Sequence, residues 1–198
     1  MTITKSAITA VPVHELIAER WSPRAFNGHA MSQDQIHALL EAARWAPSSY
    51  NLQPWRFVVW NRDDNADTFD KVYATLSSSN KAWVANVPVL IGVFADRRGV
   101  DGQENGAAAY DTGAAAFSLV LQAQALGLHA HQLGGFNRSE LQREFAIPED
   151  IVVQALIAVG YQGDEALLRD DLRAKEQAAR SRRSLNEIAF TGQWGQAF

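Results

Sequence analysis

The stretch APSSYNLQPWRFVV, residues 46 to 59, lies between a segment with helical apolar spacing and a segment rich in β-branched residues. Its first half is too polar for a hydrophobic core, and its two prolines stiffen it more than a flexible linker needs. Amide and hydroxyl groups on such a loop can bind a polar ligand with a flat ring. The same residues also serve in ordinary helix ends and turns, so the loop alone leaves both interpretations open.

The composition excludes several classes of protein. With 198 residues, 47% hydrophobic and 20% charged, the chain is typical of a globular protein. Its net charge of −4 gives no general attraction to nucleic acid or anionic membranes, and neither is expected as a partner. The absence of cysteine excludes disulfides and thiolate chemistry. Because no signal-peptide pattern and no run of about 18 apolar residues is found, a soluble cytoplasmic protein is expected.

Helical and strand patterns share the rest of the chain and predict packed layers of an α+β or α/β fold. Helices are expected over Pro12–Glu19, from Ser32 to Pro47, after an Asp67 cap, between Asn105 and Leu126, after Ser139, and in the charged segment after Asp164. Strands are expected over 56–60, 87–95, 128–133 and 151–159. Ser32 with Gln35, and Ser139 with Gln142, have the spacing of capping boxes.

No repeat or low-complexity linker divides the chain, so residues 1–198 are expected to form a single domain. The last segment, about 180–198, carries Phe190, Trp194 and Phe198. Terminal segments usually fray unless they dock, and large exposed aromatics mark interfaces. This arm is therefore expected to pack on a partner subunit.

Three further clusters could carry chemistry. In the segment RWSPR, residues 20 to 24, two guanidiniums flank a hydroxyl and could bind a phosphate, although a helix C-terminus also favours such cations. A second cationic group holds Arg180, Arg182 and Arg183, which could equally be a solvated face. Gly134-Gly135 could let backbone groups approach a ligand or could form a plain turn.

Four segments together resemble the successive motifs of the nitroreductase family: ERWSPRAF, APSSYNLQPWRFVV, YDTGAAAFSLVLQAQALGLHAHQLGGF and RSRRSLNEI. They occur in the family's order and spacing from about residue 13 to residue 188. The resemblance implies a three-layer α/β/α sandwich with a central, mostly antiparallel sheet. It also implies a homodimer that binds FMN and uses NAD(P)H as co-substrate.

The resemblance implies roles for particular residues. Arg20 and Ser22 match residues near the FMN phosphate and ribityl chain. Arg24 matches a basic residue beside the pyrimidine edge of the flavin. The loop at 47–53 matches a loop that reaches FMN, in this family partly from the second subunit. The expected cofactor-binding residues are Arg20, Trp21, Ser22, Arg24, Pro47, Ser48, Ser49, Asn51, Gln53, Asn80, Gly134, Gly135, Arg180 and Arg182. No side chain is expected to be catalytic, because flavin N5 would react while Arg24 tunes it.

Some features depart from the family pattern or suggest other sites. Some members carry an acidic residue where Gly134 stands, and the segment between Ala95 and Asn105 is shorter than in larger members. His129 and His131 share a face of a predicted strand, but no third ligand accompanies them. No metal is therefore expected.

The function implied is a ping-pong oxidoreductase in which NAD(P)H reduces FMN and a small electron acceptor then takes its place. Nitroaromatics, quinones or similar conjugated molecules are the expected acceptors. Two alternatives stay open. The chain could consume or rearrange its flavin, as dimethylbenzimidazole synthase does on a similar fold, or it could be a non-catalytic FMN-binding module.

Overall fold

The structure is a computed structural model that describes residues 3–198, so Met1 and Thr2 of the predicted domain lie outside the described residues. One sheet holds β1 (Trp55–Asn61), β2 (Val89–Asp96), β3 (His129–Leu133) and β4 (Ile151–Gly160). The strand order is β1-β2-β4-β3, and each neighbouring pair is antiparallel. β3 is consequently an edge strand with one side free of strand pairing.

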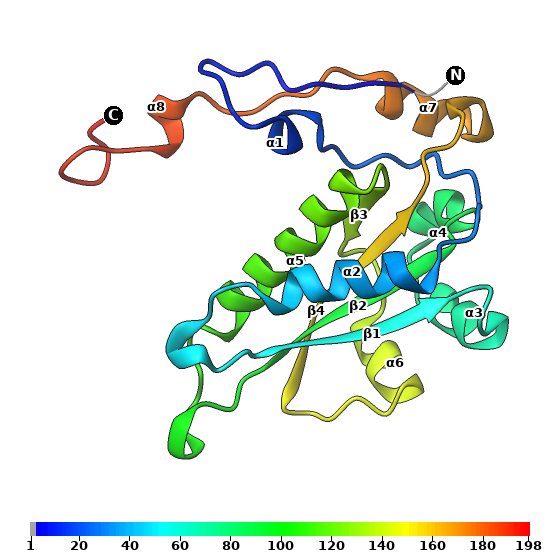
Figure 1. Ribbon diagram of the computed structural model, residues 1–198, viewed down its shortest axis with the longest axis horizontal. Coiled ribbons are helices and arrows are strands. Elements are labelled where there is room, and N and C mark those ends of the chain that lie inside the picture. Colours follow the sequence, from blue (N-terminus) through cyan, green and yellow to red (C-terminus); the bar gives the residue numbers. More distant parts are fainter. Residues whose placement is uncertain (1–2) are drawn as a thin grey trace.

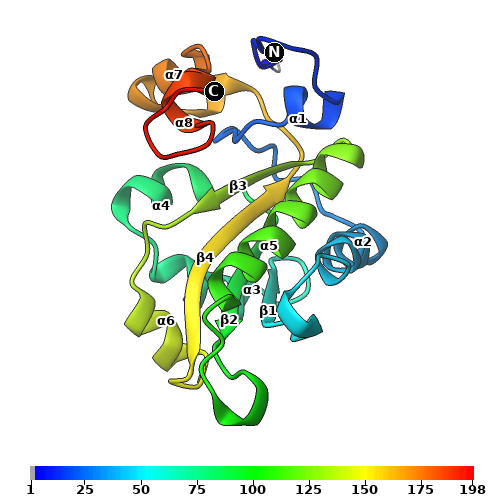
Figure 2. The ribbon, with the colours of Figure 1, turned by 90° about the vertical axis from the view of Figure 1, so that its left-hand side faces the viewer.

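Helices cover both faces of this sheet (Figures 1 and 2). On one face lie α2 (Gln33–Arg44) and α5 (Ala108–Ala125). On the other lie α3 (Ala66–Ala74), α4 (Ser78–Val84) and α6 (Arg138–Glu144). The three-layer α/β/α arrangement with an antiparallel sheet is confirmed.

A further group of short elements lies beyond the end of the sheet at which β4 finishes (Figure 1). It contains α1 (Glu15–Glu19), α7 (Asp170–Gln177) and α8 (Leu185–Ile188). Three single 3₁₀ turns complete the structure, namely η1 (Ser49–Asn51), η2 (Val100–Gly102) and η3 (Glu165–Leu167). No helix in residues 3–198 has the length and apolar character needed to cross a membrane.

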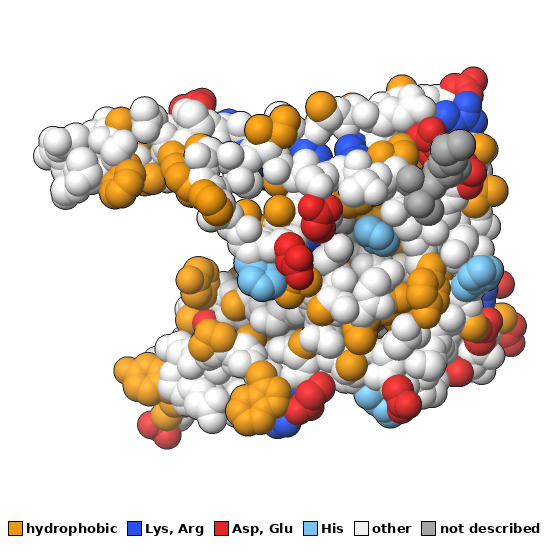
Figure 3. Space-filling model, turned by 45° about the horizontal axis from the view of Figure 1, so that its top comes forward, with side chains coloured by type: hydrophobic (Ala, Val, Ile, Leu, Met, Phe, Trp, Pro, Cys, Tyr) orange, Lys and Arg blue, Asp and Glu red, His pale blue; other side chains and the backbone are white. Residues whose placement is uncertain are grey.

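The C-terminal arm, residues 180–198, stands off the body of the molecule (Figure 3). Its tip folds on itself, since Phe190 bridges to Ala197 and the rings of Phe190 and Trp194 lie 4.9 Å apart between centroids. Trp194 nevertheless leaves 90% of its surface exposed, and Phe198 leaves 80%. Hydrophobic side chains line both sides of the gap between arm and body in Figure 3. The arm therefore presents exposed apolar surface to solvent.

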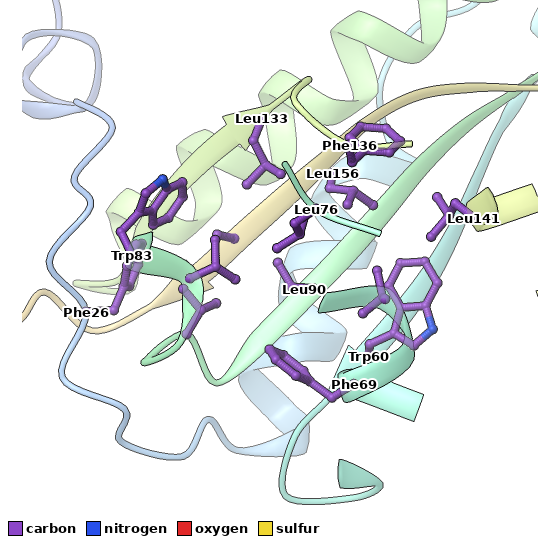
Figure 4. Close-up of a cluster of buried hydrophobic side chains, with 14 of the residues drawn as sticks. Phe26, Trp60, Phe69, Leu76, Trp83, Leu90, Leu133, Phe136, Leu141 and Leu156 are labelled. Atoms are coloured by element: carbon purple, nitrogen blue, oxygen red, sulfur yellow. The ribbon is translucent and has the colours of Figure 1, made fainter. Parts of the chain in front are cut away.

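The central strands explain why their sequences lack polar alternation. In β2, Val89, Ile91 and Val93 belong to the core under α2 and α5, whereas Leu90 and Phe94 belong to the core on the opposite face. Both faces of the strand are buried, so both sets of alternating side chains must be apolar. Figure 4 shows the second core, where Trp60, Phe69, Leu90 and Leu141 point toward one another.

Two predicted caps were wrong. The capping box of Ser32 and Gln35 is confirmed, with both of its reciprocal bonds formed. α3, however, is capped by the Asn65 side chain, which accepts from Thr68 N, and Asp67 lies in the first turn. α6 is likewise capped by Asn137. In both cases an asparagine lies two residues before the predicted cap, and its amide oxygen accepts the orphan N–H at the true helix start.

Other boundaries differ more simply. α1 begins at Glu15 and not at Pro12, because the His14 side chain accepts from Leu16 N and caps the helix there. The sequence patterns did not predict α4 or α8. Each is short, and α8 holds no buried residue, so neither carries a periodic apolar signal.

Candidate functional site

A cavity of about 920 Å³ lies between the N-terminal segment, α1, α5, β3 and the arm. Ile17, Phe117 and Val120 give it an apolar wall. Ala130 and Gln132 come from β3, whose outer edge carries backbone groups that no strand pairs. Arg20, Ser22, Arg180, Arg182 and Arg183 supply its polar end. The cavity thus combines an apolar wall, a free strand edge and a cationic end.

The cationic end joins residues from the two ends of the chain. Arg20 is half-buried, and its Nη1 donates to Ser22 Oγ at 3.3 Å. Burial lowers the pKa of the Arg20 guanidinium, and the nearby charges of Arg180 and Arg182 lower it further. Three guanidiniums that repel one another this closely form a site that favours an anion.

Arg180 is fixed by backbone acceptors. Its Nη1 donates to the carbonyl oxygens of Lys5 and Ala18, at 2.6 Å each. These bonds tie the start of the arm to the N-terminal segment and to α1. The cationic end of the cavity is therefore held in place by hydrogen bonds within the chain.

The segment 20–25 is anchored at several points. His131 Nδ1 lies 2.8 Å from the carbonyl oxygen of Pro23, and Gly163 N donates to Ala25 O at 2.8 Å. Glu176 Oε1 accepts from the backbone N–H groups of Arg24, at 2.8 Å, and Ala25, at 3.0 Å. Strand β3, the chain after β4, and α7 thus all hold this segment.

Trp21 and Arg24 occupy different surroundings from Arg20 and Ser22. Trp21 is buried, with Lys5 Nζ 4.8 Å from its ring centroid and the His129 ring 6.3 Å away. The Arg24 side chain is 28% exposed, and its Nη1 lies 3.8 Å from Glu176 Oε2. Neither residue lines the cavity.

Asn80 and Gly135 come together as a second predicted group. Asn80 Nδ2 donates to the carbonyl oxygen of Gly135 at 2.9 Å, and Asn80 Oδ1 accepts from Trp83 Nε1 at 3.2 Å. A Cβ at Gly135 would lie 2.8 Å from Asn80 Nδ2, so only glycine allows this approach. Gly134 is exposed beside it. The group follows β3 directly, and Gln132 of that strand lines the cavity.

The third predicted group, the loop at 47–53, carries strained backbone. Tyr50, Asn51 and Gln53 have φ values of 51°, 56° and 49°. Gln53 N donates to Ser48 Oγ, and Gln53 Nε2 donates to Asn51 O, at 3.0 Å each. Ser49 N donates to Asp111 Oδ2 at 3.0 Å, which fixes the loop to the first turn of α5. Left-handed backbone in non-glycine residues clusters at functional sites.

This loop does not meet the cationic end within one chain. The loop docks at Asp111, whereas the cavity touches α5 at Phe117 and Val120. Phe117, the nearer of the two, lies six residues after Asp111, or about 9 Å along the helix at 1.5 Å per residue. No residue of 47–53 lines the cavity. One chain therefore brings Arg20, Arg180 and Arg182 together with Ser22, and separately Asn80 with Gly135, but it leaves Arg24 and the loop outside the cavity.

The two strand histidines face the core opposite to the cavity. The His131 ring packs against Trp83, with ring centroids 4.6 Å apart, and burial lowers the pKa of His131 to about 4. Burial also lowers the pKa of His129, whose Nδ1 has no hydrogen-bond partner among residues 3–198. Within that same range, no group of three His, Asp or Glu side chains is placed to hold a metal ion.

Sequence patterns missed the residues that hold these groups in place. Asp111 had a usable signal, because it is the single charged residue in the 18-residue helix α5. Glu176 had none, since it lies in the charged run DDLRAKEQ, where a solvated side chain is the ordinary expectation. Lys5 lies in an irregular N-terminal segment that carries no periodic signal.

Comparison with known proteins identifies the class. Residues 17–82 and 63–161 match the model described as the Nitroreductase family. Because these segments together span more than half of the chain, the chain belongs to the nitroreductase family. The resemblance seen in its sequence is confirmed.

Individual relatives agree with the fold. An oxidoreductase containing FMN is 35% identical, with a TM-score of 0.91 over 99% of this chain and 100% of that one. A protein from Desulfovibrio desulfuricans in complex with FMN is 29% identical, with a TM-score of 0.73 over 94% and 99% of the two chains. The oxygen-insensitive NADPH nitroreductase of Helicobacter pylori is 44% identical over 84 residues, which are 42% of this chain and 38% of that protein. The matched segments span 24% to 38% of the curated nitroreductases.

Proposed function

We propose that this chain is an FMN-dependent oxidoreductase that takes electrons from NAD(P)H and passes them to a small conjugated acceptor, such as a nitroaromatic or a quinone. The observation that carries the proposal is the convergence of Arg20, Arg180 and Arg182 beside Ser22 at one end of the cavity. A phosphate group carries up to about two negative charges and is bound well by guanidinium forks. The FMN-containing relatives support the same assignment.

The residues that line the cavity fit the phosphate end of FMN. Arg20, Ser22, Arg180 and Arg182 would hold the phosphate, and the free edge of β3 would face the ribityl chain and ring. Asn80 with Gly134 and Gly135 would meet the ring where β3 ends. Bound FMN would supply the hydride and electron transfer, which protein side chains do not perform. The protein's part is to bind, orient and tune the flavin, and Arg24 would stabilise negative charge at the pyrimidine edge.

We also propose that the functional unit is a homodimer. The strained loop at 47–53 lies away from the cavity of its own chain, and the arm at 180–198 exposes Trp194 and Phe198. In a two-fold dimer each surface would meet the other chain, so that the loop of one subunit could complete the cavity of its partner. A chain without cysteine needs no oxidising compartment to fold, which supports the cytoplasmic location expected from the sequence.

The test is a flavin titration followed by anaerobic reduction. Purified protein should bind FMN, show the absorbance bands of oxidised flavin, and bleach when NADH or NADPH is added. Addition of a quinone or a nitroaromatic should restore the bands and sustain NAD(P)H oxidation. A protein that binds no FMN would refute the proposal.

Two other outcomes would identify the alternative functions. If FMN binds but neither nicotinamide bleaches it, the chain is a non-catalytic FMN-binding module. If the flavin is reduced but mass spectrometry after aerobic turnover shows fragments in place of intact FMN, the chain consumes its cofactor.

A further inference from the structure

Glu176 is a buried carboxylate that the proposed chemistry does not use. It lies on α7 with 1% of its surface exposed. Oε1 accepts from Arg24 N and Ala25 N, while Oε2 lies 3.1 Å from Arg24 N and 3.8 Å from Arg24 Nη1. A buried carboxylate is costly unless it is paired and hydrogen-bonded, and here its partners are mainly backbone N–H groups. Its contacts therefore fix the position of a segment of main chain.

The fixed segment is the one that carries the cationic end of the cavity. Glu176 holds residues 24 and 25, and Arg180, four residues later in the chain and beyond the end of α7, holds the carbonyl oxygens of Lys5 and Ala18. These two attachments bracket Arg20 and Ser22, which line the cavity. Lys5 is drawn into the same framework, since its Nζ donates to the Glu176 carbonyl oxygen at 2.7 Å.

We propose that Glu176 is a positioning residue for phosphate recognition, which holds the backbone of residues 20–25 so that Arg20 and Ser22 face the cavity. This inference rests on the proposed function, because the phosphate is that of FMN. Glu176 itself does not line the cavity and would not touch the ligand. It acts through the hydrogen bonds that its carboxylate accepts from the backbone N–H groups of Arg24 and Ala25.

Position and charge can be separated by two small substitutions. Glu176→Asp keeps the charge but withdraws the carboxylate by one methylene, so its oxygens no longer reach both N–H groups. Glu176→Gln loses the charge but keeps an acceptor oxygen at the same distance along the side chain. Glu149→Asp, at an exposed position, is the matched control for the shortened side chain.

The measurement is the affinity of each purified variant for FMN and for riboflavin, which lacks the phosphate, together with the thermal midpoint of unfolding. We expect Glu176→Asp to weaken FMN binding about tenfold and riboflavin binding less than about twofold. Glu176→Gln should stay within about threefold of the unsubstituted protein for both ligands. When Arg20→Ala is already present, adding Glu176→Asp should not change the ratio of FMN affinity to riboflavin affinity any further. The reason is that Glu176 acts on the phosphate through the position of Arg20.

Three results would overturn the inference. A parallel loss of FMN and riboflavin binding in Glu176→Asp, with a lower midpoint, would show a general structural role. A larger loss of FMN affinity in Glu176→Gln than in Glu176→Asp would show that the charge of the carboxylate matters and its position does not. If the unsubstituted protein bound FMN no more tightly than riboflavin, the phosphate site and this inference would fail, whereas the proposed function would fail only if the protein bound no FMN.

Discussion

The backbone N–H of Ser49 donates to Oδ2 of Asp111 at 3.0 Å, and this bond joins the loop after α2 to the first turn of α5. Asp111 is 5% exposed. The loop continues through left-handed backbone at Tyr50, Asn51 and Gln53. Each such residue costs on the order of 1 kcal/mol or more and persists only where the surrounding structure holds it. Asp111 is one of the groups that hold this loop.

Asp111→Ala should therefore release the loop. We expect the free energy of unfolding to fall by about 1–2 kcal/mol, because Ser49 N loses a charged acceptor. FMN affinity should fall as well, if the loop completes the site of a partner subunit. Chemical denaturation and flavin titration measure the two effects.

Thr112→Val is the matched control for this substitution. Thr112 is the next residue of α5 and is fully buried, and its Oγ1 has no hydrogen-bond partner in residues 3–198. Valine has nearly the same shape, so the substitution should be neutral or slightly stabilising. An Asp111→Ala protein that matched Thr112→Val in both measurements would show that the Ser49 bond does not hold the loop.

Local signals in the sequence predicted the fold well where the interactions themselves are local. The capping box of Ser32 and Gln35 needs residues only three apart, and both of its bonds form. The cap of α3 was missed because Asn65 and Asp67 are both good capping residues, and the main-chain path of the preceding turn decides between them. α4 was missed because it is short and buries only Trp83 and Val84 at its end.

The site was predictable to the extent that its residues form motifs. Arg20, Ser22, Arg180 and Arg182 were singled out by family resemblance, and the structure brings them to one cavity. Glu176 could not be found in this way, because its role depends on contacts with Arg24 and Ala25. These residues lie 152 and 151 positions earlier in the chain. Side chains that position a site through long-range contacts leave no local pattern in the sequence.

Gly135 and Gly134 offer a matched pair of substitutions. A Cβ at Gly135 would lie 2.8 Å from Asn80 Nδ2 and 2.9 Å from Ser77 Oγ, whereas a Cβ at Gly134 would meet nothing closer than Arg138 Nη2 at 3.8 Å. Gly135→Ala should displace Asn80 and lower FMN affinity severalfold, with a loss of about 1 kcal/mol in stability. Gly134→Ala leaves Asn80 in place and should change stability by no measurable amount, so its flavin affinity should stay above that of Gly135→Ala. Equal flavin affinities in the two variants would show that the position of Asn80 does not matter for binding.

His131 predicts a pH dependence of stability. Its pKa in the folded protein is about 4, below its ordinary value of 6.5, because it is buried. Between these values the unfolded chain takes up a proton that the native protein does not, so stability falls as the pH falls from about 6.5 to about 4. From pH 7 to pH 5 the loss should be roughly 2 kcal/mol.

His131→Asn should flatten this part of the stability profile, since asparagine does not titrate. Denaturant melts at half-unit pH intervals would measure the slope. His37→Asn, at an exposed position, is the control and should leave the slope as it is. An unchanged slope in His131→Asn would mean that other groups dominate the dependence.

Trp194 provides a test of the dimer. It is 90% exposed and contacts the Phe190 ring at the tip of the arm, so most of its apolar surface faces water. A buried aromatic anchor contributes strongly to an interface, and Trp194→Ala should weaken dimerisation at least about tenfold. Leu167→Ala, which removes another exposed apolar side chain far from the arm, should have no effect. Sedimentation velocity over a range of concentrations would measure the association, with flavin absorbance followed in the same cells.

If the loop of one subunit completes the site of the other, dilution should release FMN from Trp194→Ala before it does so from the unsubstituted protein. A flavin-loaded monomer of about 21.8 kDa would contradict both the dimer and the shared site.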